Sequence, residues 1–457
     1  MKTSLIDSHC HLEMDAFNSD RDEIVKRAND SGIKQILNPG SDREGNIRGL
    51  EMSKKYPNVY SAVGIHPHDA RTLDKKLFNE LEKWATQPKV VAIGEIGLDY
   101  HYLHSPKGVQ IEAFRRQINL ANEVGLPIIV HSREAKNDTI RVLREAAGET
   151  AGVLHCFSGD IDMAHRVMEL GFLISMAGPV TFNKAKELRD VAKFVPDEFL
   201  LIETDAPYLS PVPKRGKRNE PSYLIHTAKV ISEIRGITVE DVARITSLNA
   251  MRLFKTGTIP GQGEITYKIR DSLYLNITNR CTNKCGFCIR SRTNYVKGHN
   301  LRLEREPTAL QVIKSIKDPT SYREIVFCGI GEPLLRLDVV KKVSKWIKEQ
   351  GGRVRINTNG HGNLIHDRNI LPELKGIVDS LSVSLDAENE KKYNKICKPS
   401  FNGAYQGVVS FIKESIKVIP EVKATVVQIP GVNIKKCEAI AKDLGVELRI
   451  RKFDVVG

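Results

Sequence analysis

Short runs of aliphatic and β-branched residues alternate with longer amphipathic stretches through the first 255 residues of the chain. The stretches at 21–31 and 108–123 repeat their apolar residues every three or four positions, as helices that bury one face do. Eight strand–helix units predict an α/β fold, a (β/α)8 barrel, with strands at residues 5–7, 34–37, 59–63, 90–94, 128–130, 152–155, 172–175 and 200–203.

A second alternation begins after a segment that is rich in glycine and threonine. Residues 255–263 read Lys-Thr-Gly-Thr-Ile-Pro-Gly-Gln-Gly, a composition that is typical of linkers. Six further strands are predicted beyond it, at residues 273–278, 324–327, 353–357, 381–384, 422–427 and 447–453. The sequence therefore predicts one domain over residues 1–258, a linker over 259–269, and a partial (β/α)6 barrel over 270–457.

The composition suits two globular domains and places the positive charge on one of them. A chain of 457 residues is long for a single core. Residues 1–260 hold 35 Lys+Arg and 35 Asp+Glu, so residues 261–457, with the remaining 34 of 69 and 21 of 56, carry the whole net charge of +13. This asymmetry favours an anionic ligand for the C-terminal half, although a solvated lysine-rich surface explains it equally well.

The sequence contains no recognisable targeting or membrane-spanning segment. Its start lacks the apolar run of a signal peptide, and no stretch approaches the roughly 20 apolar residues of a membrane span. Eight cysteines are too few for a disulfide scaffold, and three of them lie within eight residues, which indicates metal binding. We therefore expect a cytoplasmic protein with no membrane partner.

The first candidate metal site begins with the segment Asp7-Ser-His9-Cys-His11. Residues i and i+2 of an extended segment face the same way, so His9 and His11 can converge on one cation. Further candidate ligands follow later predicted strands, where (β/α)8 enzymes carry their chemistry: Glu95, His131, His155 and Asp205. Four histidines and two carboxylates are enough for two divalent cations, with a glutamate bridging them.

These motifs belong to a longer set that resembles the TatD family of deoxyribonucleases. The set consists of seven ordered runs within residues 1–258, namely 7–11, 64–68, 94–100, 131–133, 155–158, 203–208 and 213–221. The resemblance implies a metal-dependent hydrolase of DNA, acting on single strands or 3′ ends as a 3′–5′ exonuclease. Zn, Mn, Mg or Fe could serve as the metal, and histidine-rich sites favour the others over Mg.

The resemblance also implies a role for each candidate residue. The expected ligands are His9, His11 and Asp205 for the first cation, His131 and His155 for the second, and Glu95 for both. Asp205 also suits proton transfer from the attacking water, so Asp205 and Glu95 are the expected catalytic residues. His66 and Arg133 are expected to bind the substrate, through its phosphate oxygens, and Glu203 to support a ligand. For the loop 214–218, substrate contact and a structural role stand as equal alternatives.

Cys281, Cys285 and Cys288 form a CxxxCxxC loop directly after the first predicted strand of the second domain. Three thiolates leave one iron of a four-iron cluster open for another ligand. Structural zinc normally takes four ligands, so the zinc alternative needs a further one, for which His299 is the candidate.

This loop and several later runs resemble the radical-SAM superfamily, whose members cleave S-adenosylmethionine reductively at a 4Fe–4S cluster. Phe287, before the third cysteine, is typical of that superfamily. The residues expected to bind the cofactor are Gly329, Gly331, Glu332 and Pro333 at its amino group, and Asn357, Asn359, Ser384 and Asp386 at its ribose. Residues 428–433 match the adenine motif only loosely, without its acidic end, which leaves the adenine contacts open. The resemblance further implies a low-potential electron donor such as flavodoxin or ferredoxin.

The sequence thus predicts a bifunctional enzyme, a two-metal deoxyribonuclease joined to a radical-SAM domain. The substrate of the second domain is open, and its positive charge favours a nucleotide-like compound. Two alternatives remain. The barrel could hydrolyse acyl esters or amides, since two-metal barrels do both. The iron–sulfur domain could be a redox-responsive regulatory module and not a catalyst.

Overall fold

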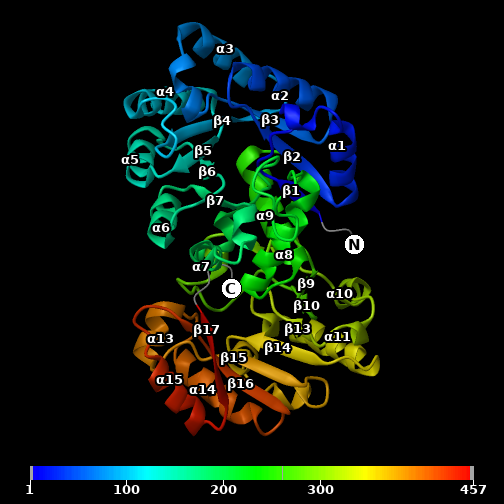
Figure 1. Cartoon of the computed structure of the whole chain (residues 1–457). Helices are drawn as coiled ribbons and strands as arrows, with labels where there is room; N and C mark the ends of the chain where they lie inside the picture. Colours follow the sequence, from blue (N-terminus) through cyan, green and yellow to red (C-terminus); the bar gives the residue numbers. More distant parts are fainter. Residues whose placement is uncertain (1–3, 260, 453–457) are drawn as a thin grey trace. The chain divides into compact units, whose positions relative to one another are not determined.

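Eight parallel strands pair in chain order in the N-terminal part of the computed structural model, which describes residues 4–259 and 261–452 (Figure 1). The backbone N–H of Ser8 donates to the carbonyl of Ile202 at 3.3 Å, and Cys10 forms a β-bridge with Ala206. These contacts bring the first strand to the last, so the predicted (β/α)8 barrel is confirmed. Its strands are β1 (Leu5–Asp7), β2 (Ile33–Pro39), β3 (Val59–Val63), β4 (Val90–Asp99), β5 (Ile128–Arg133), β6 (Gly152–Leu154), β7 (Leu173–Met176) and β8 (Leu200–Ile202).

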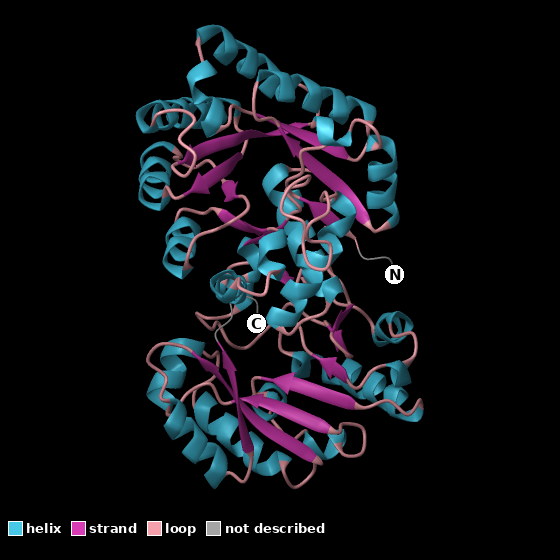
Figure 2. Ribbon diagram, viewed as in Figure 1, coloured by secondary structure: helices cyan, strands magenta, loops and turns pink. Residues whose placement is uncertain are grey.

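Helices alternate with these strands along the chain and surround the sheet (Figure 2). Asp42, Asp74 and Asp160 each precede a helix and accept a hydrogen bond from an amide in its first turn, which fixes where the helix begins. The helices are α1 (Arg21–Asp30), α2 (Arg43–Lys55), α3 (Lys75–Ala85), α4 (Lys107–Val124), α5 (Lys136–Ala146), α6 (Ile161–Glu169), α7 (Lys186–Phe194), α8 (Leu224–Arg235) and α9 (Val239–Phe254).

Helix α9 covers the end of the barrel where the strands begin. The Asn249 side-chain amide donates to the carbonyls of Asp197 and Leu200 at 2.6 and 2.9 Å, and Ser247 Oγ donates to the carbonyl of Ser4 at 3.1 Å. Leu253 and Phe254 pack in a buried cluster with side chains from seven strands, Ile6, Leu37, Ala62, Ala92, Ile129, Val153 and Leu201. Helix α9 therefore does not cover the opposite end of the barrel, where the strands finish and the polar residues of the predicted site lie.

The second unit is built on a seven-stranded sheet with the order β17-β16-β15-β14-β13-β10-β9. Six of its strands are parallel, as predicted: β10 (Ser272–Leu275), β13 (Ile325–Phe327), β14 (Val354–Thr358), β15 (Ser380–Ser384), β16 (Glu421–Gln428) and β17 (Glu447–Lys452). The chain divides into its two units after residue 259. Phe453, which was predicted in the last strand, and Pro260, in the predicted linker, lie outside the described residues.

The predicted linker differs from the structure at its C-terminal end. Residues 266–269 form strand β9 (Thr266–Ile269), which pairs antiparallel with β10 through a two-residue turn. Arg270 has a φ of 56° in that turn. The ring of Tyr267 is 4% exposed and stacks on Tyr274 with centroids 5.2 Å apart, and this burial holds the segment on the sheet.

One face of this sheet packs on helices, and the other carries polar side chains. Leu275, Phe327, Ile356 and Val383 belong to one buried cluster with residues of the helices α10 (Ala309–Ser315), α11 (Leu337–Glu349), α12 (Gly362–His366), α13 (Glu390–Cys397), α14 (Ala404–Ser415) and α15 (Ile434–Asp443) or next to them. The residues that alternate with these on β14 to β16 are polar, such as Asn357, Ser384 and Thr425. Among the described helices, none is long and apolar enough to span a lipid bilayer.

Candidate metal centre and cluster loop

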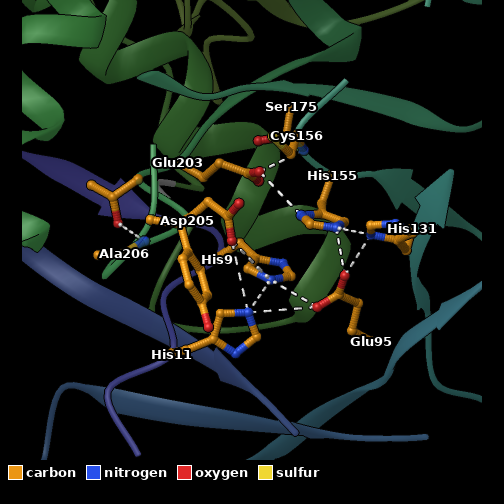
Figure 3. A network of polar contacts seen from close by, with 12 residues as sticks. His9, His11, Glu95, His131, His155, Cys156, Ser175, Glu203, Asp205 and Ala206 are labelled. Carbon is orange, nitrogen blue, oxygen red and sulfur yellow. Dashed lines mark hydrogen bonds and ion pairs between the residues drawn. The ribbon is translucent and has the colours of Figure 1, made fainter. Parts of the chain in front are cut away.

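Six predicted ligands converge at the end of the barrel where the strands finish (Figure 3). Glu95 and His131 lie on β4 and β5, and the others directly follow β1, β6 and β8. All but His131 are at most 9% exposed. The chain therefore brings together His9, His11, Glu95, His131, His155 and Asp205, as the strand-end argument predicted.

The two carboxylate oxygens of Glu95 face two different groups of imidazoles (Figure 3). Its Oε2 lies 3.4 Å from His9 Nε2 and 3.5 Å from His11 Nε2. Its Oε1 lies 2.9 Å from His131 Nδ1 and 2.7 Å from His155 Nε2. A carboxylate placed in this way can bridge two cations, one held on each side.

The spacing of the donor atoms fits such cations. The Nε2 atoms of His9 and His11 are 3.2 Å apart, and Asp205 Oδ1 lies 3.9 and 3.7 Å from them. Nitrogen and oxygen ligands lie about 2.0–2.2 Å from a zinc ion, so neighbouring ligands of one ion are about 3–3.5 Å apart. His66 was expected to contact phosphate, yet its Nε2 lies 3.3 Å from Glu95 Oε1, beside His131. His66 therefore belongs to the group of potential metal donors around Glu95 Oε1, and donor atoms of His66, Glu95 and His131 lie within 4.8 Å of one another.

The buried carboxylates of the site favour positive charge beside them. Glu95, Glu203 and Asp205 are buried together. Burial disfavours the ionised form of Glu95, but the nearby histidines hold its pKa well below the usual range. Burial likewise disfavours the charged form of His155, but Glu95 and Glu203 raise its pKa well above the ordinary value. Burial raises the pKa of Asp205 to about 6, against the opposing effect of His155 and His11. The carboxylates thus draw positive charge to this point.

A second layer of carboxylates lies behind the imidazoles. Asp99 Oδ2 lies 3.2 Å from His131 Nε2, Glu203 Oε1 lies 3.3 Å from His155 Nδ1, and Glu13 Oε1 lies 3.4 Å from His11 Nδ1. Carboxylates in this position support a ligating histidine, and the Asp99 contact is also a hydrogen bond, whereas the Nδ1 atoms of His155 and His11 have no hydrogen-bond partner among the described residues. Glu203 was expected in this role. Asp99 and Glu13 were not, although Asp99 lies four residues after Glu95 in one of the quoted runs.

Arg133 and the loop 214–218 lie nearer the surface. The guanidinium of Arg133 lies over the ring of Tyr102, 4.8 Å from its centroid, and Arg133 is exposed. Arg218 is bound to the carboxylate of Asp20 at 2.9 Å, and Arg215 lies 4.4 Å from the ring centroid of Phe182. The contact to Asp20 gives the loop a structural role.

The three clustered cysteines lie in the loop that follows β10, and all three are partly exposed. The loop is held by its backbone: Lys284 N donates to the carbonyl of Cys397 at 2.9 Å, and Gly286 N donates to that of Ile396 at 3.0 Å. Both ring nitrogens of His299 are engaged elsewhere, with Glu264 at 2.9 Å and with the carbonyl of Lys268 at 3.2 Å. The arrangement therefore disfavours the zinc alternative that needs His299.

A fourth thiol at this loop was not expected from the sequence. Cys397, the last residue of α13, is fully buried and packs near Cys285, and the neighbouring thiol together with burial raises the pKa of Cys397. The contact joins residues that are far apart in the chain, so no sequence spacing indicates it. Cys437 is buried in the same core, and Cys328 follows β13.

The residues expected at the amino group of S-adenosylmethionine follow β13. Gly329 and Gly331 admit no side chain, because an added Cβ would lie 2.2 Å from Asn276 Oδ1 and from the carbonyl of Thr278 respectively. Glu332, which precedes Pro333, is buried and accepts hydrogen bonds from Leu334 N at 3.0 Å, Thr358 Oγ1 at 2.8 Å and Asn359 N at 2.7 Å. Its carboxylate thus holds the end of β14 in place. It already accepts three hydrogen bonds within the protein, whereas a residue that only binds the cofactor would have its oxygens free.

The residues expected at the ribose gather at the ends of β14 and β15. Asn357 Oδ1 accepts from Arg355 at 2.9 Å, Asn359 Nδ2 donates to Thr282 Oγ1 at 2.8 Å, and Ser384 Oγ lies 3.5 Å from Thr425 Oγ1. Asp386 is 5% exposed, and its Oδ1 has no hydrogen-bond partner in the described part of the chain. A buried carboxylate oxygen without a partner fits a hydroxyl-bearing ligand such as a ribose.

Comparison with known families supports both assignments. Residues 6–255 match the family model described as TatD related DNase, which covers more than half of the chain. The chain belongs to the TatD-related DNases. Residues 275–444 match the Radical SAM superfamily, so this TatD-related DNase carries a second enzyme domain. These families imply divalent metals for the first domain, and an iron–sulfur cluster with S-adenosylmethionine for the second.

Individual relatives cover the N-terminal domain almost completely. A Bacillus subtilis protein described as uncharacterized metal-dependent hydrolase YabD is 44% identical over 252 residues, 55% of this chain and 99% of that protein. A Salmonella typhimurium protein described as 3′-5′ ssDNA/RNA exonuclease TatD is 36% identical over 257 residues, with 55% and 99% covered. The crystal structure of YJJV, a TatD homologue from Escherichia coli, is similar with a TM-score of 0.54 and 30% identity, and covers 56% of this TatD-related DNase and 100% of that chain.

Proposed function

We propose that the N-terminal barrel is a 3′–5′ exonuclease that hydrolyses single-stranded DNA with two divalent cations. His9, His11 and Asp205 would hold one cation, His131 and His155 would hold the other, and Glu95 would contribute to both. The observation that carries this proposal is the position of Glu95, whose two oxygens face the two groups of histidines at 2.7–3.5 Å. The direction of cleavage and the single-stranded substrate are supported by the Salmonella relative, described as a 3′-5′ ssDNA/RNA exonuclease.

The residues of the chain have separate tasks in this reaction. When bound, two cations would lower the pKa of a water and stabilise the charge on the oxygen of the leaving group. Asp205 Oδ1, at the edge of the His9 and His11 pair, is placed to accept the proton that this water loses. Arg133 is exposed at the site and positions a phosphate oxygen, because its planar guanidinium can donate two parallel hydrogen bonds to a phosphate. Asp99 accepts a hydrogen bond from His131 Nε2 and keeps that imidazole in the tautomer that leaves Nδ1 free, while Glu13 and Glu203 lie at ion-pair distance from His11 and His155.

We further propose that the C-terminal domain binds one 4Fe–4S cluster through Cys281, Cys285 and Cys288 and cleaves S-adenosylmethionine. Asp386, with its unpartnered buried oxygen, supports a ribose contact there, together with Ser384 and Asn357. A flavodoxin or ferredoxin would deliver the electron. The excess of 34 basic over 21 acidic residues in 261–457 supports a nucleotide-like substrate.

The nuclease proposal is tested by cleavage of a 5′-labelled single-stranded oligonucleotide by the full chain with Mn²⁺. Products that shorten one nucleotide at a time from the 3′ end are expected, and EDTA should stop the reaction. Glu95→Gln should lower kcat by about a thousandfold or more, since loss of one group that stabilises transition-state charge already costs about 10²–10³. Glu134→Gln, an exposed glutamate after β5, is the matched control and should keep full activity.

Two results would contradict the nuclease proposal. One is full activity of a Glu95→Gln sample that is free of contaminating nuclease. The other is hydrolysis of acyl esters or amides without any cleavage of DNA, which would favour the alternative reaction class.

A further inference from the structure

A cavity of about 260 Å³ lies directly beside the proposed metal ligands. His131, His155 and Asp205 form part of its lining, so whatever fills it lies next to the reacting phosphate. The lining on the other sides is mainly apolar, with Phe157, Met176, Val180, Leu188 and Leu209.

The chemistry of these walls excludes a second phosphate as the occupant. Anions are bound in proteins by N–H groups and cationic side chains, and the apolar side of this lining offers neither. Arg133, the cationic side chain of the lining, is the residue already assigned to the reacting phosphate, so it does not serve a second one. The part of a substrate that enters here is therefore uncharged.

The size of the cavity limits the occupant to one ring system. Pockets for drug-sized ligands measure about 300–1,000 Å³, and this one lies just below that range. A planar heterocycle fits, whereas two successive nucleotides do not. Since the cavity shares three residues with the proposed metal site, its occupant belongs to a nucleotide that is attached directly to the reacting phosphate.

We propose that this cavity binds the 3′-terminal nucleobase of the strand, so that each cleavage removes one nucleotide. The inference rests on the proposed nuclease function and adds the group that is recognised. The lining offers few hydroxyl donors, because Ser158 Oγ donates to the carbonyl of Ser132 at 3.5 Å and Ser132 Oγ shares a hydrogen bond of 2.9 Å with Thr139 Oγ1. Recognition therefore depends on apolar contact and discriminates little among the four bases.

The test compares two single-stranded oligonucleotides that differ in one base. One ends in an ordinary 3′ nucleoside, and the other carries an abasic tetrahydrofuran residue at its 3′ end. Stacking or burial of one base contributes enough that kcat/KM for the abasic end should fall about ten- to a hundredfold. An abasic residue at the 5′ end should leave removal of the first nucleotide unchanged. Equal rates on the ordinary and the 3′-abasic strands would overturn the proposal.

A variant locates the effect in the cavity. Leu188→Glu adds a carboxylate to the wall from the partly exposed face of α7, and should lower kcat/KM for the ordinary strand to that of the abasic one. Phe194→Glu is the matched control, because Phe194 lies on the same helix, is 41% exposed and does not line the cavity. A loss that is equal on both strands would place the effect of Leu188→Glu at the metals and overturn the proposal. If the unaltered chain cleaves neither strand, the nuclease function itself is wrong and the base site with it.

Discussion

Replacing Asp99 by asparagine should weaken the binding of one cation without unfolding the barrel. Asp99 is 1% exposed, and its Oδ1 accepts backbone hydrogen bonds from His101 and Tyr102 at 2.9 Å each. Its Oδ2 faces Nε2 of His131 at 3.2 Å and Nε2 of His68 at 3.0 Å. An asparagine keeps the first pair of contacts with its carbonyl oxygen and loses the second pair.

The size of the effect follows from the tautomer of His131. With a carboxylate at Nε2, the ring carries its proton there and leaves Nδ1, 2.9 Å from Glu95, free for a cation. An amide N–H₂ in place of Oδ2 cannot accept that proton and favours the tautomer in which Nδ1 is protonated. Loss of such a partner costs about 10–100-fold in metal affinity, or about 1.4–2.8 kcal/mol.

The assay is a titration of the EDTA-treated full chain with Mn²⁺, followed by calorimetry and by nuclease activity. Asp99→Asn should shift the affinity of one cation and recover its activity at high Mn²⁺. Asp138→Asn is the control, because the Asp138 carboxylate accepts a hydrogen bond from the Tyr100 hydroxyl at 2.8 Å and does not contact the imidazoles. This variant should behave like the unaltered chain. Unchanged metal affinity in Asp99→Asn would refute the assignment of His131 as a ligand through Nδ1.

Three further predictions concern the second domain and the domain boundary. Replacement of any one of the three clustered cysteines by alanine should abolish the visible absorption of the reconstituted cluster. Cys397→Ala and the matched control Cys437→Ala should keep this absorption. Loss of the cluster in Cys397→Ala alone would show that Cys397 is a ligand. Burial raises the pKa of Glu332 to about 7 from 4.5, so the folded state binds more protons between these values and stability should fall by about 3 kcal/mol as pH rises through them. Urea unfolding at pH 5 and 7.5, followed by the fluorescence of Trp346 in a Trp84→Phe background, should show this fall in the free energy of unfolding, and Glu332→Gln should remove it. An equal fall in both proteins would contradict the assignment of the pH dependence to Glu332. The fragment 1–258 should fold and keep the nuclease activity of the full chain, and an insoluble or inactive fragment would show that its boundary is wrong.

The pattern of hydrophobic runs was sufficient for the strands, because a buried parallel strand leaves a local signal in the sequence. It also placed His9, Glu95 and Asp205 together, since the ends of parallel strands in a barrel meet at one rim. Strand β9 was missed because it directly follows a stretch whose glycines and threonines favour a linker, and burial of Tyr267 holds it on the sheet.

Contacts between distant segments could not be predicted in the same way. Asp99 and Glu13 reach the imidazoles through side-chain directions that no spacing rule fixes. Cys397 meets Cys285 across 112 positions, and only the packing of α13 on the cluster loop brings them together. Glu332 matched a motif in type and position, but its three hydrogen bonds to neighbouring elements became visible only in the folded chain.

The central claim is that Glu95 bridges two cations that act together. The most direct measurement is electron paramagnetic resonance of the full chain during titration with Mn²⁺, with the nuclease rate recorded on the same samples. The account predicts that the rate rises with the second equivalent of Mn²⁺, together with the spectrum of a magnetically coupled pair, and that Glu95→Gln shows uncoupled ions and almost no activity. Full activity with one equivalent, or two uncoupled ions in the active unaltered chain, would contradict it.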